Sequence, residues 1–318
     1  MKNWTMVMLF CVITSVAGAQ DSVTVWALKG PSGVGMIRLF ENVPQIPKMT
    51  VKVDAYADAQ LMAAAFIKGD AKIGILPPNL AAKIASTGKQ LQIAAVTGQG
   101  MLSLLTTDAS VKTIDDLKGR SISVAGQGAV PEYVFRKILL EHGLNPDSDV
   151  RFDFSLAYPE IAQSIITGRI QIALLPEPFA TMALMGNKNT GKVSDIKSEW
   201  IKSGGPDNFP LTVLMVDGIF ARKNPAAVRI IMNSVRDSIN WVTENPVEAG
   251  ALVEKHGLGL KAPVVAASIP NSNYVYVEAP LARPSLEALF KVFLEFAPAS
   301  IGGSMPKNTF YFNPRNPR

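Results

Sequence analysis

Short apolar runs alternate with helical patterns along most of this 318-residue chain. Residues 22–28 alternate between apolar and polar, and a glycine-rich turn and a helical pattern follow them. The short apolar runs at 73–76 and 170–175 each stop at a proline. Such continuous runs are typical of parallel strands covered by helices on both faces. The pattern therefore predicts an α/β protein built from right-handed βαβ units.

The pattern occurs twice, at a constant offset of 99 residues. Leu-Pro-Pro-Asn at 76–79 returns as Leu-Pro-Glu-Pro at 175–178, and Val25 falls on Val124. We interpret this as two copies of one supersecondary unit. Two long copies predict two lobes, whereas repeats of about 20–50 residues would predict a solenoid. Two ordinary αβ units of similar length could also give such a match by convergence.

Two extended apolar segments, 101–107 and 211–220, are predicted to cross between the lobes and form a two-strand hinge. Lobe I then comprises 20–106 and 217–318, and lobe II comprises 107–216. The end of lobe I, from 307 on, is rich in proline and asparagine and is predicted to lie on the surface.

The N-terminus has the pattern of a secretory signal peptide over residues 1–19. An apolar run at 6–13, too short to span a membrane, precedes the small residues Ala17-Gly18-Ala19. The single cysteine, Cys11, lies inside this segment, so the mature chain has no disulfide and no thiolate metal site. A lipid anchor on Cys11 is an alternative, although the bulky Phe10 before it disfavours one.

Charge and histidine content argue against several function classes. The formal net charge of +5 is spread along the chain without a basic block, so we expect no nucleic-acid interface. The two histidines, His142 and His256, each lie next to a glycine near a predicted helix end. No metal-ligand cluster or nucleophile motif occurs, so we expect no catalytic residue, no metal site and no cofactor.

In open parallel sheets, ligands bind beyond the carboxyl ends of the strands, near the N-termini of the following helices. The turns after the predicted strands should therefore share one rim. The residues predicted to bind a ligand there are Lys29, Ser32, Gly33, Tyr56, Pro77, Asn79, Gln99, Gln127, Gly128, Ala129, Tyr158 and Glu177.

Four motifs in a fixed order carry a family resemblance. They are Ile114–Val124 (IDDLKGRSISV), Gly126–Tyr133, Leu174–Ala183 (LLPEPFATMA) and Phe220–Pro225. With them the chain resembles solute-binding proteins of ABC importers with the type II periplasmic-binding fold, in the nitrate/sulfonate/taurine-like or thiamine-precursor-like group. The resemblance covers 22–305. It implies a periplasmic protein of two hinged α/β lobes that binds one ligand in a cleft and delivers it to membrane permease subunits. We expect a monomer.

Glu177 is the residue of greatest interest on the rim. Between Pro176 and Pro178, its carboxylate is predicted to face a wet cleft and to accept hydrogen bonds from a donor-rich ligand. The alternative is an acid that stabilises the start of a helix. Tyr56 and Tyr158 follow corresponding strands, where they could flank a flat ring or be ordinary rim aromatics.

The charges of the rim favour one ligand class. An anion site requires arginine, lysine or aimed N–H groups without a competing carboxylate, and the rim turns contain Lys29 but no arginine. We therefore favour a small heteroaromatic such as an aminopyrimidine vitamin precursor, with nitrate, a sulfonate or taurine as the alternative. An enzyme such as a menaquinone-pathway lyase shares this fold and is the rival from another class. Pyrimidine synthases of the fold use a cysteine-rich motif that is absent here.

Overall fold

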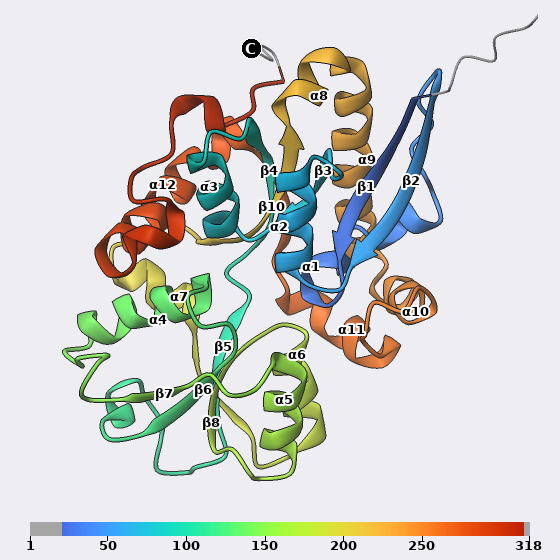
Figure 1. Ribbon diagram of the computed structural model, residues 1–318. Coiled ribbons are helices and arrows are strands. Elements are labelled where there is room, and N and C mark those ends of the chain that lie inside the picture. Colours follow the sequence, from blue (N-terminus) through green and yellow to red (C-terminus); the bar gives the residue numbers. More distant parts are fainter. Residues whose placement is uncertain (1–20, 315–318) are drawn as a thin grey trace, which may run out of the picture.

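The computed structural model describes residues 21–314, so the predicted signal peptide and Cys11 lie outside the described residues. The chain forms two α/β lobes, each built on one sheet (Figure 1). This confirms the predicted fold class. The first sheet has the order β11-β4-β10-β3-β1-β2 and the second has the order β7-β6-β8-β5-β9. Among residues 21–314, no helix is both long and apolar enough to cross a membrane.

The first sheet and its helices draw on both ends of the described chain. Its strands are β1 (Asp21–Leu28), β2 (Met49–Tyr56), β3 (Ile73–Leu76), β4 (Leu91–Gln99), β10 (Pro210–Asp217) and β11 (Tyr274–Glu278). Its α-helices are α1 (Pro31–Val34), α2 (Ala59–Lys68), α3 (Pro78–Ser86), α8 (Gly218–Lys223), α9 (Pro225–Glu244), α10 (Pro246–Lys255), α11 (Ala262–Ser268) and α12 (Ala279–Phe296). Short 3-10 helices are η1 (Ile37–Phe40), η3 (Ile269–Asn271), η4 (Pro298–Ile301) and η5 (Asn308–Phe310).

The second sheet is formed by one uninterrupted stretch of chain. Its strands are β5 (Leu102–Thr106), β6 (Ser121–Val124), β7 (Arg151–Asp153), β8 (Ile172–Pro176) and β9 (Gly191–Asp195). Its helices are η2 (Asp115–Leu117), α4 (Val130–Glu141), α5 (Tyr158–Ile166), α6 (Phe179–Gly186) and α7 (Ile196–Lys202).

The two repeats have the same strand order. In the first repeat, β1 lies between β2 and β3, and in the second, β6 lies between β7 and β8; all of these pairs are parallel. Beside the third strand of each repeat, the sheet continues with an antiparallel strand, β10 next to β3 and β5 next to β8. Val25 pairs with Ile73, whereas Val124 pairs with Leu174 and not with Ile172, its counterpart at the 99-residue offset. A shift of two residues keeps the same side chains on the inward face, so both copies retain their core.

The predicted crossing segments lie within the sheets. β5 pairs with β8 and β9 in the second sheet, and β10 pairs with β3 and β4 in the first. The chain passes between the sheets at 100–101 and at 203–209, where Gly100 N donates to Phe209 O at 3.0 Å. An extended apolar pattern is equally typical of a buried strand, and the two predicted hinge segments are the strands that adjoin these crossings. The division into lobes stays a proposal, and the strand pairing favours limits near these two crossings.

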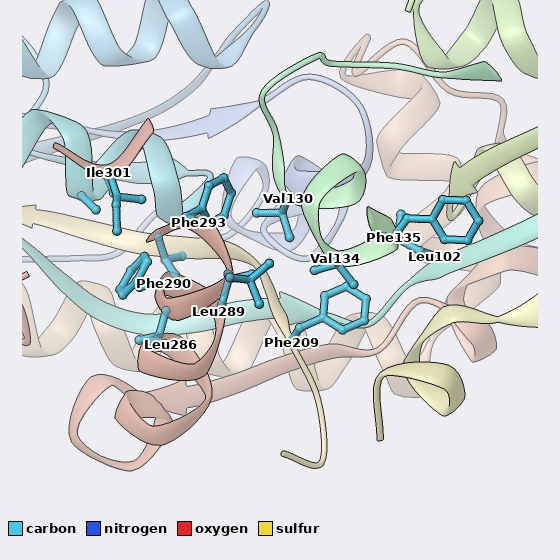
Figure 2. Close-up of a cluster of buried hydrophobic side chains, with 14 of the residues drawn as sticks. Leu102, Val130, Val134, Phe135, Phe209, Leu286, Leu289, Phe290, Phe293 and Ile301 are labelled. Carbon is cyan, nitrogen blue, oxygen red and sulfur yellow. The ribbon is translucent and has the colours of Figure 1, made fainter. Parts of the chain in front are cut away.

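Hydrophobic side chains of both lobes pack together beside the crossings. Val134 and Phe135 of α4 belong to the same buried cluster as Leu289 and Phe293 of α12 (Figure 2). The ring of Tyr133 lies 5.1 Å from that of Phe293, edge to face. Helix α4 of lobe II is therefore packed against α12 of lobe I in this conformation.

The predicted surface position of the tail is wrong for residues 310–312, which are docked on the first sheet. Phe310, Tyr311 and Phe312 are 3%, 7% and 3% exposed. Phe312 N donates to Ile93 O at 2.8 Å, next to a parallel bridge between Tyr311 and Ile93. Three successive aromatic residues cover a part of β4 that would otherwise be open to solvent, and their apolar area outweighs the polar composition around them.

Candidate functional site

A polar cavity of about 290 Å³ lies between the lobes, beside the first crossing. It contains groups that can hold a charged or donor-bearing molecule. Its polar and charged residues are Ser103, Glu177, Lys192, Asp195, Lys197 and Ser198 from lobe II, with Asn271 and Asn273 from lobe I. Two lysines therefore share the cavity with two carboxylates, so the lining does not carry one sign of charge.

Glu177 lies in this cavity but does not face a wet cleft as predicted. It is only 2% exposed, and its Oε2 accepts a hydrogen bond from Thr181 N at 3.0 Å. Pro176 and Pro178 beside it are buried as well, which the local sequence does not reveal. Because α6 begins at Phe179, the Thr181 contact is that of a helix-start acid, the alternative role considered for this residue.

Burial determines the electrostatics of Glu177. Desolvation raises the pKa of its carboxyl group, while hydrogen bonds from Thr181 and the charge of Lys192 act in the opposite direction. A carboxyl group of this kind favours a partner that donates hydrogen bonds or carries positive charge. It also resists an anion in the same cavity.

The rims of the two lobes meet at Asn79 and Gly128. Asn79 Nδ2 donates to Gly128 O at 3.3 Å, which joins the start of α3 to the turn before α4. Asn79 Oδ1 is buried and has no hydrogen-bond partner among the described residues. A buried acceptor without a partner is costly, so this oxygen is suited to a donor supplied by a bound molecule.

The two tyrosines are half-buried, and each lies against an aromatic ring of its own lobe. The ring centroid of Tyr56 lies 4.3 Å from that of Trp26, and the ring of Tyr158 is stacked on Phe179 at 5.8 Å. Burial also raises the pKa of the Tyr158 hydroxyl. Trp26 Nε1 is buried without a partner in the described chain, and it is a donor that sequence reasoning did not single out.

The predicted binding residues fall into separate groups. Lys29 N donates to Tyr56 O at 2.9 Å within lobe I, Asn79 meets Gly128, and Gln99 N contacts Asn273 O at 3.4 Å beside the cavity. The others flank these contacts in the same turns or at the following helix starts: Ser32, Gly33, Pro77, Gln127, Ala129 and Tyr158. That all of them bind one ligand stays a prediction.

Sequence reasoning missed the lysines and asparagines of the cavity. Lys192 lies on β9 and Lys197 on α7, while Asn273 precedes β11. These elements border antiparallel strands, so the rule that ligands lie beyond the carboxyl ends of parallel strands does not point to them. The apolar segment 101–107, which contains β5, lies beside the adjacent crossing and is the signal that the sequence gives for this region.

Carboxylates occupy the helix starts of lobe II. Gly128 N, before α4, donates to Glu132 Oε2 at 2.7 Å, and Ala157 N, before α5, donates to Glu160 Oε2 at 2.9 Å. With Glu177, which lies just before α6, each of these three helices has an acid of its own at the positive end of its dipole. The N–H groups that these acids accept from are thus not available to an anionic ligand.

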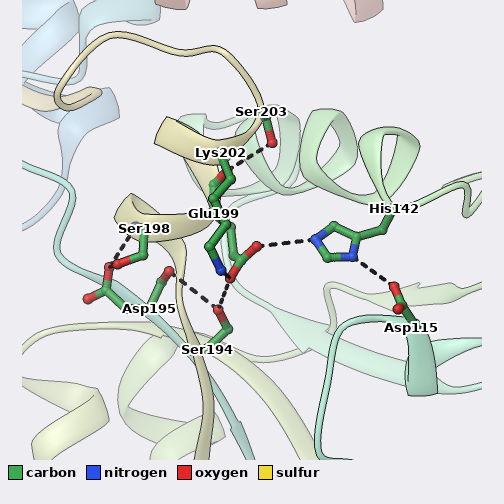
Figure 3. Close-up of polar contacts among 8 residues, drawn as sticks. All are labelled: Asp115, His142, Ser194, Asp195, Ser198, Glu199, Lys202 and Ser203. Atoms are coloured by element: carbon green, nitrogen blue, oxygen red, sulfur yellow. Dashed lines mark hydrogen bonds and ion pairs between the residues drawn. The ribbon is translucent and has the colours of Figure 1, made fainter.

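Both histidines have structural partners. His142, at the end of α4, lies between Asp115 (Nδ1–Oδ1 2.7 Å) and Glu199 (Nε2–Oε2 3.2 Å; Figure 3). His256 Nε2 lies 2.6 Å from Glu41 Oε1. Since both nitrogens of His142 contact carboxylates, its ring is held in place and has no nitrogen left for a substrate. Within residues 21–314, no group of three or more His, Cys, Asp or Glu side chains could hold a metal ion.

A family model described as NMT1/THI5 like matches residues 49–249. The chain belongs to this family. Compared with curated protein sequences, it has no match.

Solved structures share the fold of this NMT1/THI5-like chain. An ABC transporter from Parabacteroides distasonis is 22% identical, with a TM-score of 0.80 over 92% of this chain and 99% of that one. The periplasmic aliphatic sulphonate binding protein SsuA from Escherichia coli is 17% identical, with a TM-score of 0.72 over 90% and 93%. A DszB mutant in complex with biphenyl-2-sulfinic acid is 14% identical, with a TM-score of 0.63 over 90% and 94%. At these identities the likeness shows the fold alone.

Proposed function

We propose that this protein is the solute-binding component of an ABC importer, which holds one small molecule between its lobes and delivers it to a permease. One observation carries the proposal: a polar cavity lined by both lobes contains the buried carboxyl group of Glu177. A ligand in that position contacts both lobes at once, so it stabilises one relative arrangement of them. The family and the likeness to SsuA support this function.

We propose that the ligand is rich in hydrogen-bond donors, as an aminopyrimidine is. Glu177 in the cavity and the unpartnered Asn79 Oδ1 at the rim are both acceptors. A small anion such as a sulfonate is the second candidate, because Lys192 and Lys197 also line the cavity and because SsuA is named as a sulphonate-binding protein. Taurine combines both chemistries, since it has an ammonium group for the carboxylate and a sulfonate for the lysines.

The first experiment identifies the solute. Native mass spectrometry of the protein purified from its own cells should show an additional mass that is lost on denaturation. Calorimetry on the wild type and Glu177→Gln then distinguishes the ligand classes, with an aminopyrimidine and an alkanesulfonate as probes. Loss of a charge-assisted hydrogen bond is worth about 1.5–3 kcal/mol, which weakens the affinity for a donor-rich ligand about 10- to 100-fold. Tighter binding of the sulfonate to the variant would instead support the anion.

An enzyme on this fold is the rival proposal, since the solved DszB structure has the same fold. A binding protein should bind its solute with a stoichiometry of one and leave it unchanged. Incubation of the wild type with the identified solute, followed by mass spectrometry of the small molecule, tests this. Conversion of the solute at catalytic protein concentration would refute the transport proposal.

We also propose a periplasmic, monomeric protein whose lobes close on the ligand. The passages of the chain at 100–101 and 203–209 are the points about which such a movement would occur. Small-angle scattering should give a smaller radius of gyration at saturating solute, at the mass of a monomer. N-terminal sequencing of the exported protein should begin at Gln20. A lipid-modified Cys11 at the N-terminus would contradict cleavage after Ala19.

A further inference from the structure

Glu132 is a buried acid that the proposed binding function does not use. It is 3% exposed and lies in the first turn of α4. Its Oε2 accepts from Gly128 N at 2.7 Å, and its Oε1 accepts from Arg136 Nε at 2.8 Å. Arg136 in turn donates to Asp147 Oδ1 at 2.7 Å and lies over the ring of Phe152. Both oxygens of the carboxylate therefore have strong donors.

These two donors are the ones that an oxyanion would use. Backbone N–H groups at a helix start and an arginine guanidinium are the groups that bind sulfonates, phosphates and carboxylates in proteins. Here the protein's own carboxylate takes both of them. The Glu132 carboxylate lies next to the contact between the lobes, because the carbonyl oxygen of Gly128, whose N–H it binds, accepts from Asn79 Nδ2.

We infer that Glu132 is a specificity-determining residue: it acts as an internal anion that fills the oxyanion receptor at the start of α4. The receptor would otherwise comprise Gly128 N–H and the Arg136 guanidinium. While Glu132 occupies it, lobe II rejects oxyanions at this rim by charge repulsion and by lack of donors, and it accepts neutral or cationic solutes. This inference rests on the proposed solute-binding function only for its biological purpose, since the receptor itself can be tested with simple anions.

Charge balance supports the assignment. Arg136 faces two carboxylates, Glu132 and Asp147, so its positive charge is already compensated. The neighbouring helices α5 and α6 have Glu160 and Glu177 at their starts in the same way. An anion that approaches the rim of lobe II from the cleft therefore meets acids at all three helix starts, and Glu132 is the one of these acids that is paired with an arginine.

The test compares the wild type with Glu132→Ala, which exposes Gly128 N–H and Arg136. Calorimetry with sodium methanesulfonate and with sodium sulfate, at constant ionic strength, should show an affinity at least about tenfold higher for the variant. The sulfate should also raise the melting temperature of the variant more than that of the wild type. Equal affinities in the two proteins, or no anion binding by a folded variant, would overturn the inference.

Two further variants keep the test decisive. Glu132→Gln keeps one acceptor oxygen, for either Gly128 N or Arg136 Nε, and removes the negative charge. It should fold and bind the anions more tightly than the wild type, though less tightly than Glu132→Ala. If Glu132→Ala does not fold, the anion affinity of Glu132→Gln relative to the wild type tests the inference. Glu160→Ala is the matched control, because it removes an acid from a helix start of the same lobe without freeing an arginine, and it should gain no anion affinity. If the transport proposal fails, no solute will co-purify, whereas failure of this inference shows only in the anion titrations.

Discussion

Helices α1 and α4 begin at equivalent positions of the two repeats, at Pro31 and Val130, 99 residues apart. The third residue of each helix differs completely. In lobe I it is Gly33, where an added Cβ would lie 2.1 Å from Leu28 O. In lobe II it is Glu132, whose carboxylate binds the turn before its own helix. One position thus serves close backbone packing in one lobe and charge compensation in the other.

The same contrast extends to the other helix starts. In lobe I, Asp58 caps α2, while α1 and α3 start without a side-chain cap. In lobe II, three glutamates accept from the helix-start N–H groups. Among the three repeated helices of each lobe, the acids are therefore concentrated in lobe II, although Asp217 also caps α8 in lobe I. The following predictions test how far this difference between the lobes holds, from the largest expected effect to the smallest.

Gly33→Ala should be the most destabilising change. The added methyl group would overlap the carbonyl of Leu28 and approach Leu258 Cδ1 at 3.3 Å, so the turn between β1 and α1 must move. We expect a loss of about 3 kcal/mol or more in the free energy of unfolding, measured by urea denaturation. Gly128→Ala in lobe II, with nothing within 4 Å but a φ of +82°, should cost about 1–2 kcal/mol. Equal costs would show that the two turns are not sterically distinct.

Glu177→Gln should make the protein more stable near neutral pH. Because burial raises the pKa of Glu177 above its ordinary value of 4.5, the folded state holds a proton that the unfolded state releases as the pH rises. The folded wild type is therefore fully stable, as far as this group is concerned, below pH 4.5, and it loses stability as the pH rises through the raised pKa of Glu177. At a pH above the raised pKa, we expect the free energy of unfolding of the variant to exceed that of the wild type by about 1–2 kcal/mol. At pH 4 we expect no difference between the two proteins. Chemical denaturation of both proteins near neutral pH and at pH 4 measures this difference in stability. An identical dependence of stability on pH in the two proteins would contradict a raised pKa.

Asp58→Ala and Glu160→Ala compare equivalent helix starts, those of α2 and α5. Asp58 Oδ1 accepts from Gln60 N and Leu61 N, at 2.8 and 2.9 Å, so its loss should cost about 1 kcal/mol. Glu160 is exposed and accepts only from Ala157 N, so its loss should cost about 0.5 kcal/mol. Thermal unfolding of both variants measures the difference. A larger effect at Glu160 would reverse the ranking.

Asn79→Ala removes the hydrogen bond between the rims and should have the smallest effect on stability. A single neutral bond at 3.3 Å contributes about 0.5 kcal/mol, and removal of the unpartnered Oδ1 offsets part of it. If this contact holds the lobes together, small-angle scattering of the unliganded variant should give a larger radius of gyration. Asn187→Ala, on an amide that bonds only within lobe II, is the control and should leave the radius unchanged.

Much of the fold could be predicted from the sequence because its signals are local. The apolar runs that became β3 and β8 have a definite length and end at prolines, and the 99-residue offset relates two units of the same strand order. Other features depend on long-range packing. The docking of Phe312 on Ile93 and the burial of Glu177 cannot be read from a local pattern, because they depend on which distant surfaces are left open.

The candidate site was only partly predictable for the same reason. Asn79 and Gly128 follow or precede elements whose positions the βαβ rule determines, and they do meet. Lys192 and Asn273 reach the cavity through antiparallel strands at the edges of the sheets, for which the rule makes no statement. Glu132 lies within the motif Gly126–Tyr133, but its pairing with Gly128 and Arg136 can be seen only in the three-dimensional structure.

The docked C-terminal segment has a consequence for the order in which the chain can be assembled during synthesis. Lobe II is one continuous stretch, whereas the sheet of lobe I joins strands from the first hundred residues to β10, β11 and Tyr311. A chain emerging from its N-terminus can therefore complete lobe II while half of lobe I is still missing. In the unfinished first sheet, β4 has neither of its neighbours until β10 (Pro210–Asp217) is made, and it lacks the second until β11 (Tyr274–Glu278) follows. Until then β4 has an open edge of the kind that can pair with other chains, and the segment that contains Tyr311 is the last described part of the chain to join this strand.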